Sequence, residues 1–72
     1  MASLDEECTA IFDAEGLTGV NRHLHDMFPD IVARDRAAME LEDTGHWKVV
    51  RYYSEVDASI VPTRVVVTHF LG

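Results

Sequence analysis

Apolar residues recur at helical spacing near the start of the chain. At about 100° per residue, one stripe is formed by Leu4, Cys8, Ile11 and Phe12. Ser3 and Glu6 have the spacing of a capping box, and the acidic residues after Ser3 suit the positive end of a helix dipole. Gly16 is a typical C-terminal stop. The pattern therefore predicts a helix over residues 4–15.

A second apolar stripe follows directly. Its members are Val20, Leu24, Met27 and Phe28. Thr18 can cap a helix at this point, and Pro29 disfavours helical geometry at the residue before it. We therefore expect a second helix over residues 19–28.

Residues 30–43 fit two structures. Asp30 can cap a helix that begins at Ile31, and most of residues 37–42 are strong helix formers. Asp35 and Glu42, however, would lie on the side that this helix buries.

The alternative for this segment is a strand. Ala37, Met39 and Leu41 would then alternate inward, and residues 43–45 would form a hairpin turn into the next strand. The helix is favoured, and the strand stays open.

The last third of the chain favours β-structure. Residues 46–53 are rich in strand formers, and residues 54–59 are polar and turn-like. Residues 60–71 are strongly β-branched, with Pro62 suited to a strand start or a sheet edge. The simplest pairing is antiparallel, 46–53 against 63–71. The predicted fold is α+β, with two or three N-terminal helices packed on a small C-terminal sheet of two or three strands.

The length of 72 residues predicts a single small acidic domain over residues 1–72, and 47% hydrophobic residues are enough for a core. No apolar run approaches the roughly 20 residues of a membrane span, and the first residues lack the features of a signal peptide. Cys8 is the only cysteine, so an internal disulfide is excluded and a reducing compartment is favoured. We therefore expect a cytoplasmic protein without membrane contact.

Charge is distributed unevenly along the chain. Thirteen acidic and six basic residues give a net charge of −7. Residues 1–43 hold eleven acids and three arginines, a formal −8, whereas residues 44–72 hold two acids and three bases, a formal +1. Such a chain repels nucleic-acid phosphates and attracts basic surfaces. The alternative is that the acidity serves solubility alone.

The histidines carry a weak metal signal. His23 and His25 are two residues apart and would point to opposite sides of a helix. His46 and His69 lie on the two predicted strands and could be neighbours, but zinc would also need a ligand such as Asp26 or Asp30. Ordinary surface or core-edge histidines are the favoured interpretation, and no metal is expected.

Catalytic signals are also missing. Cys8 lies on the apolar stripe beside Asp5, Glu6 and Glu7, which disfavour a reactive thiolate, so a core cysteine is expected. The sequence has no EF-hand loop, phosphate loop, dinucleotide fingerprint or nucleophile elbow. We expect neither an enzyme nor a bound cofactor.

The favoured function is binding of a protein partner with a basic surface, which the chain would inhibit or regulate. Carboxylates along one side could imitate a phosphate backbone and occupy the groove of a nucleic-acid-binding complex. Small acidic phage inhibitors act in this way and provide a functional analogy. Aromatic residues could anchor the contact, unless they are core residues. The candidate residues are Asp5, Glu6, Asp13, Glu40, Glu42, Asp43, Trp47, Tyr52 and Tyr53.

The alternative is a winged helix-turn-helix DNA-binding regulator. Three helices followed by a β-hairpin have that element order, and residues 20–24 look locally like a recognition helix. Only Arg22, Arg34 and Arg36 are available to the helices for phosphate contacts, and the net charge disfavours nucleic acid as a partner.

Self-association is a further expectation. The segment 63–71 carries apolar groups on both faces, more than one face of a two-stranded sheet can bury. The helices or a second copy must cover the remaining face, so a homodimer through the 63–71 strand is predicted.

Overall fold

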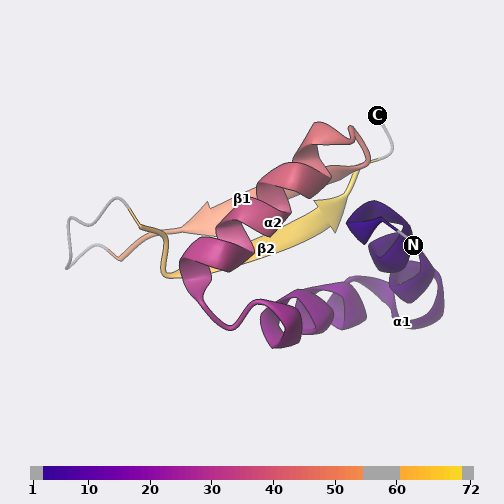
Figure 1. Cartoon of the computed structure of the whole chain (residues 1–72), viewed down its shortest axis with the longest axis horizontal. Coiled ribbons are helices and arrows are strands. Elements are labelled where there is room, and N and C mark those ends of the chain that lie inside the picture. The colour runs from indigo at the N-terminus through magenta and orange to yellow at the C-terminus, as the bar shows by residue number, and fades with distance from the viewer. Residues whose placement is uncertain (1–2, 55–60, 71–72) are drawn as a thin grey trace.

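Two helices precede two strands in the computed structural model, which describes residues 3–54 and 61–70. The elements are α1 (Leu4–Met27), α2 (Ile31–Asp43), β1 (Trp47–Tyr52) and β2 (Arg64–His69). In Figure 1, α2 lies across the two-stranded sheet and α1 runs on its β2 side. This confirms the predicted α+β fold with N-terminal helices on a C-terminal antiparallel sheet. Neither helix has an apolar stretch long enough to cross a bilayer.

The two predicted N-terminal helices form one bent element, α1. Ser3 caps it by accepting a hydrogen bond from the Glu6 backbone N–H at 3.2 Å. Gly16 has φ 75° and ψ −168°, the left-handed side of conformational space that favours glycine, and the helix bends there (Figure 1). The expected stop at Gly16 is therefore a kink. Helical geometry resumes after it, so Thr18 lies inside the helix and does not cap it.

The segment 30–43 is a helix, and the strand alternative is wrong. Asp30 caps α2 by accepting a hydrogen bond from the Ala33 N–H at 3.1 Å. Asp35 does not enter the core, because it lies at the flank of α2 and accepts a hydrogen bond from Arg51 Nε of β1. The segment 43–45 is the connection from α2 to β1, where Gly45 has φ 82°.

The strands pair in the antiparallel register Trp47↔His69 through Tyr52↔Arg64. The side chains facing the helices are Trp47, Val49, Arg51, Val65, Val67 and His69, the more buried set in each strand. Pro62 is buried just ahead of β2, as expected for a proline at a strand start. Most of the predicted turn over 54–59, and Leu71 of the predicted strand, lie outside the described residues.

Asn21 joins the second half of α1 to the edge of β2 that does not pair with β1. Its side-chain amide donates to the carbonyl oxygens of Leu17 and Val67, at 3.0 and 3.1 Å. Its oxygen accepts from the Val67 N–H at 2.8 Å. The Asn21 amide therefore bonds both backbone groups of Val67 as a third strand would.

Replacing Asn21 with Leu should destabilise the domain by about 2 kcal/mol, because two buried backbone groups of Val67 lose their partners. Urea denaturation followed by the fluorescence of the single Trp47 measures the change. The exposed neighbour Arg22, changed to Ala, serves as the control and should stay within about 0.5 kcal/mol of the wild type. Equal stability of the two variants would contradict a structural role for Asn21.

Candidate functional site

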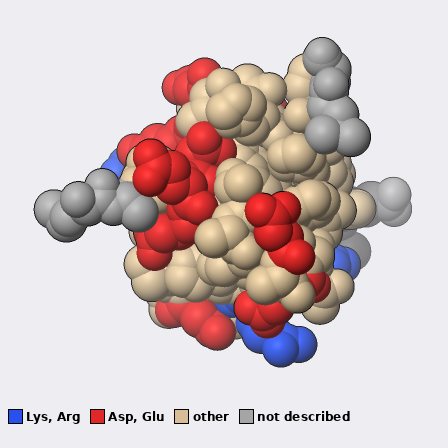
Figure 2. Space-filling view, turned by 90° about the vertical axis from the view of Figure 1, so that its right-hand side faces the viewer, with Lys and Arg blue, Asp and Glu red and all other residues tan. Residues whose placement is uncertain are grey.

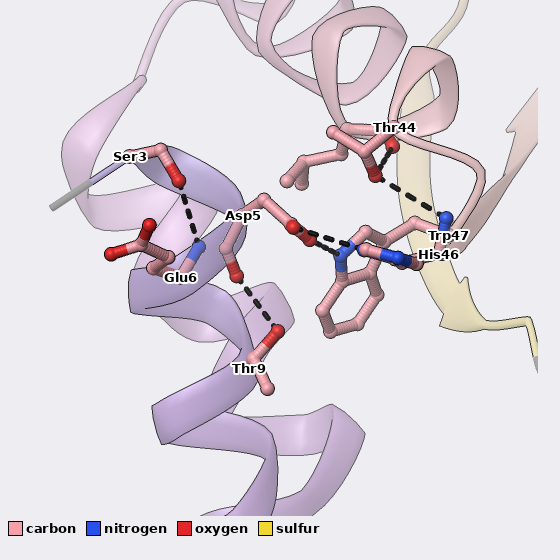
Figure 3. A network of polar contacts seen from close by, with 8 residues as sticks. Ser3, Asp5, Glu6, Thr9, Thr44, His46 and Trp47 are labelled. Carbon is pink, nitrogen blue, oxygen red and sulfur yellow. Dashed lines mark hydrogen bonds and ion pairs between the residues drawn. The ribbon is translucent and has the colours of Figure 1, made fainter.

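The carboxylate of Asp5 joins the start of α1 to the start of β1 (Figure 3). Its Oδ1 accepts a hydrogen bond from the indole Nε1 of Trp47 at 2.7 Å, and its Oδ2 lies 3.0 Å from His46 Nδ1. Thr9 donates its hydroxyl to the Asp5 backbone carbonyl at 2.8 Å. The Asp5 side chain keeps only 19% of its surface exposed. Asp5 therefore fixes the first turn of α1 against the sheet.

Three rings continue this contact inward. His69 stacks on Phe12 with a centroid distance of 4.7 Å and meets Trp47 edge-on at 5.0 Å. Phe12 and Trp47 meet edge-on at 6.1 Å. The ring cluster holds His69 beside the first half of α1. His46, which precedes β1, and His69, which ends β2, therefore line the same surface next to α1.

The acidic side of α1 and these histidines enclose an open depression of about 550 Å³. Its lining residues are Asp5, Glu6, Thr9, Ala10, Asp13, His46 and His69. A smaller depression of about 220 Å³ adjoins it, shares Asp5, and includes Glu40 from α2. Carboxylates from both helices thus meet at one end of the molecule.

No Lys or Arg lies within ion-pair distance of the acidic residues at this end, among the residues described. Two of the arginines are used elsewhere. Arg34 is buried and donates to the backbone carbonyls of Phe28 and Pro29, whereas Arg51 pairs with Asp35. Figure 2 shows Asp and Glu side chains spread over this end, with Lys and Arg only at its margin.

The pKa of Asp5 lies below the ordinary aspartate value. The main cause is the hydrogen bond from Trp47, which stabilises the ionised carboxylate, and the contact with His46 acts in the same direction. Partial burial opposes the shift. Asp5 therefore stays charged well into the acidic range and contributes negative potential to the depression.

The predicted aromatic anchors do not gather at this acidic end, which is formed by Asp5, Glu6 and Asp13 of α1 and Glu40 of α2. Trp47 is 1% exposed and belongs to the core, so it presents no surface to a partner in this fold. Tyr52 and Tyr53 are about half exposed but lie at the opposite end of β1. Among the predicted acidic residues, Glu42 and Asp43 are exposed at the end of α2 and line neither depression.

The histidines lie near carboxylates other than those expected. His23 Nε2 is 4.0 Å from Glu7, and His25 Nδ1 is 3.9 Å from Asp26. Asp5, and not Asp26 or Asp30, meets His46. Within residues 3–54 and 61–70, no three His, Cys, Asp or Glu side chains are placed to hold a metal ion.

Cys8 is fully buried in the core, as predicted. Burial raises the pKa of its thiol to about 11, and the negative charges of Glu7 and Asp5 act in the same direction. The thiol is therefore a packing group with little thiolate at neutral pH.

The residues of the DNA-binding alternative are separated by the fold. Val20 and Leu24 of the supposed recognition helix are buried, while Arg22 is exposed between them. The Arg34 guanidinium donates hydrogen bonds to the backbone of the α1–α2 connection and is not available to phosphates. Arg22 and Arg36 are the exposed cations left on the two helices.

Sequence reasoning found the carboxylates of the site and missed its other half. His46, His69 and Thr9 were not among the partner-binding candidates, although all three line the larger depression. The spacing of the two histidines on the predicted strands was the available signal. Nothing local indicates the bond between Asp5 and Trp47, which are 42 residues apart.

Comparison of the chain with protein-family models, with curated proteins and with solved structures gave no match.

Asp5→Asn should lower the free energy of unfolding by about 1–2 kcal/mol at neutral pH, because a charge-assisted hydrogen bond becomes a neutral one. Since the folded pKa of Asp5 is depressed, this contribution is present above the ordinary aspartate value of about 3.9 and is lost as the pH falls through the folded value. Urea denaturation at about pH 7 and about pH 3 measures it.

The difference between wild type and Asp5→Asn should therefore shrink on acidification. Asp13→Asn removes a carboxylate that is exposed and serves as the matched control, with little effect at either pH. A constant difference across the pH range would refute the assigned role of the Asp5 charge.

Proposed function

We propose that this chain is a protein-binding module that receives basic side chains of a partner at its acidic end and thereby inhibits or regulates that partner. The observation that carries the proposal is the convergence of Asp5, Glu6 and Asp13 on one depression without a Lys or Arg neutralising them among the described residues. A depression of about 550 Å³ is large enough for a lysine or arginine side chain.

The end of α2 supports a functional origin for this charge. Its last turn holds acidic residues and no basic one, although the helix dipole favours cations at that position. Glu40, Glu42 and Asp43 are exposed there, and helix stability does not explain them. Such a local conflict is expected where a surface serves binding.

The partner class that fits this surface is a protein with a cationic groove, including one that binds nucleic acid. Carboxylates spread over one end of a small rigid body can take the place of phosphates in such a groove. Complementary charge accelerates association and makes it dependent on ionic strength. Occupation of the groove would exclude its normal ligand, which accounts for inhibition.

Charge reversal tests the proposal. Glu6→Lys and Asp13→Lys should each weaken partner binding about three- to tenfold, since each replaces an attraction by a repulsion. Partners captured from the native host are identified by mass spectrometry, and their affinity is then measured for each variant. Raising the salt from about 0.1 M to about 1 M should weaken the wild type, as the Debye length falls from about 10 Å to about 3 Å.

Asp26→Lys is the matched control, because Asp26 is exposed on the second half of α1 and lines neither depression. It makes the same change in net charge and should alter affinity less than about twofold. Equal losses for all three variants, or binding indifferent to salt, would refute the acidic end as the contact surface.

Binding of duplex DNA would contradict the proposal and favour the DNA-binding alternative. A gel shift at low salt should show no retained duplex for the wild type, because Arg34 and Arg51 are engaged within the fold. Retention that Arg22→Ala abolishes would favour the winged-helix alternative.

The predicted homodimer through the 63–71 strand stays a prediction. Pairing through the edge of β2 would have to displace Asn21 from both backbone groups of Val67. The outward face of that strand is the remaining surface for such a contact, with Phe70 41% exposed beside it.

A further inference from the structure

Along each strand, the backbone N–H and C=O groups point alternately toward the other strand and outward from the sheet edge, and the strand register determines which residues point outward. Phe70 N–H donates to the His46 carbonyl at 2.8 Å, so His46 and Phe70 form a hydrogen-bonded pair. Alternation along an antiparallel ladder then makes Val49↔Val67 a non-hydrogen-bonded pair. The N–H and C=O groups of Val49, and of Arg51 two residues on, therefore point out of the sheet at the β1 edge.

These two edges differ in how they are covered. At the β2 edge, the Asn21 amide occupies both backbone groups of Val67. At the β1 edge, no residue in the described ranges, 3–54 and 61–70, hydrogen-bonds the outward groups of Val49 or Arg51. An open strand edge of this kind pairs readily with another strand.

An exposed apolar stripe of α2 lies beside the same edge. Asp35 bonds Arg51 of β1, so the Asp35 side of α2 faces that strand. At about 100° per residue, Val32 and Met39 lie just beyond Asp35 and away from the core. They are 43% and 50% exposed.

We propose that two copies of this chain associate through the open edge of β1. The two hairpins then form one four-stranded antiparallel sheet, in which the two β1 strands are central and the two β2 strands are outermost. A two-stranded sheet has little stability of its own, and this pairing satisfies the open backbone groups of both copies.

Charge and strand overlap together select the register. With the twofold axis at Val49, Val49 pairs with Val49 of the second copy, Lys48 faces its Val50, and Arg51 faces its Trp47. No like charges then stand opposite each other. A register centred on Lys48 or Arg51 would oppose two like charges. One centred on Trp47 or Val50 would pair β1 with residues outside the strand, so only the Val49 register pairs all three outward residues of β1.

The helices fit the same arrangement. Because α2 contacts both strands, its axis lies roughly midway between them, and strands are about 4.8 Å apart. The two α2 helices then lie about 9–10 Å apart and antiparallel, which is a normal packing distance. Val32 and Met39 become covered, and Arg36 approaches the acidic C-terminal half of the other α2.

This dimer is independent of the proposed partner binding. Val32, Arg36, Met39 and Val49 line neither acidic depression. The two processes also respond to salt with opposite sign. Two copies of charge −7 repel each other, so salt favours the dimer, whereas it weakens binding to a basic partner.

Molecular mass measured during dilution from micromolar to nanomolar concentration tests the proposal. We expect a dimer at the upper end that dissociates on dilution and persists further at about 0.5 M salt. Val49→Pro removes an outward N–H without removing a ladder bond to β2, and should weaken association at least about tenfold. Met39→Lys should also weaken it, and it changes an exposed residue, so it keeps the test valid if the proline variant does not fold.

Phe70→Ser is the control. Phe70 is exposed and follows β2, and its ring contacts the Lys48 side chain at 4.8 Å, so the change leaves the outward backbone groups of β1 intact. It should leave the mass unchanged. A folded monomer at all concentrations overturns the proposal, and so does a dimer that Phe70→Ser dissociates while Met39→Lys and Val49→Pro do not.

Disulfide trapping tests the register. When Lys48→Cys and Val50→Cys proteins are mixed and oxidised, the mixed disulfide should form in preference to either homodisulfide, since Lys48 faces Val50 of the second copy and neither residue faces its own counterpart. Cys8 is buried with a pKa of about 11, so it does not compete. Homodisulfides in equal yield would overturn the register centred on Val49.

Discussion

The hydrogen bond from Trp47 to Asp5 is the contact on which the rest of this structure depends. Trp47 is the largest fully buried side chain, and its indole N–H needs an acceptor once it leaves water. Asp5 supplies that acceptor from the first turn of α1 at 2.7 Å. The same carboxylate contacts His46 and thereby places α1 over the start of the hairpin. One interaction thus links the buried Trp47 of the core to the position of the acidic surface.

The use of the arginines determines the charge of that surface. Arg34 closes the connection between the helices, and Arg51 holds α2 to β1 through Asp35. A small domain has few cations to distribute. Here Arg34 and Arg51 serve internal hydrogen bonds, and Lys48 and Arg64 lie over the rings of Phe70 and Tyr52. The carboxylates of the first half of α1 and the end of α2 are left without a Lys or Arg ion-pair partner among the described residues. Their field is therefore available to a basic surface.

The sheet is the less complete part of the fold. Two strands expose two edges, and the molecule protects them unequally. Asn21 seals the middle of β2 from the side of α1. The β1 edge lies beside an α2 surface that exposes Val32 and Met39. A chain of 72 residues buries a modest share of its surface, so association with another chain is a natural source of additional stability.

The sequence by itself determined the helical character of residues 4–28 and the hairpin, because their signals are local. The Ser3 cap, the bend at Gly16, the end before Pro29 and the β-branched C-terminal segment each act over a few residues. It also placed Asp5, Glu6 and Asp13 on one side of α1. Only the tertiary structure decided between helix and strand at 30–43. Asp35 argued against a helix until Arg51, 16 residues away, was found to bond it at the flank.

The role of each site residue was likewise a tertiary matter. Trp47 was a candidate anchor by composition, yet it is a core residue because Asp5 lies within reach of its N–H. His46 and His69 joined the acidic depression because strand register and ring stacking bring the ends of the hairpin to α1. Hydrophobic periodicity specifies which face of an element is buried. It does not specify which distant polar group contacts that face. Here those contacts determine which residues line the acidic depression.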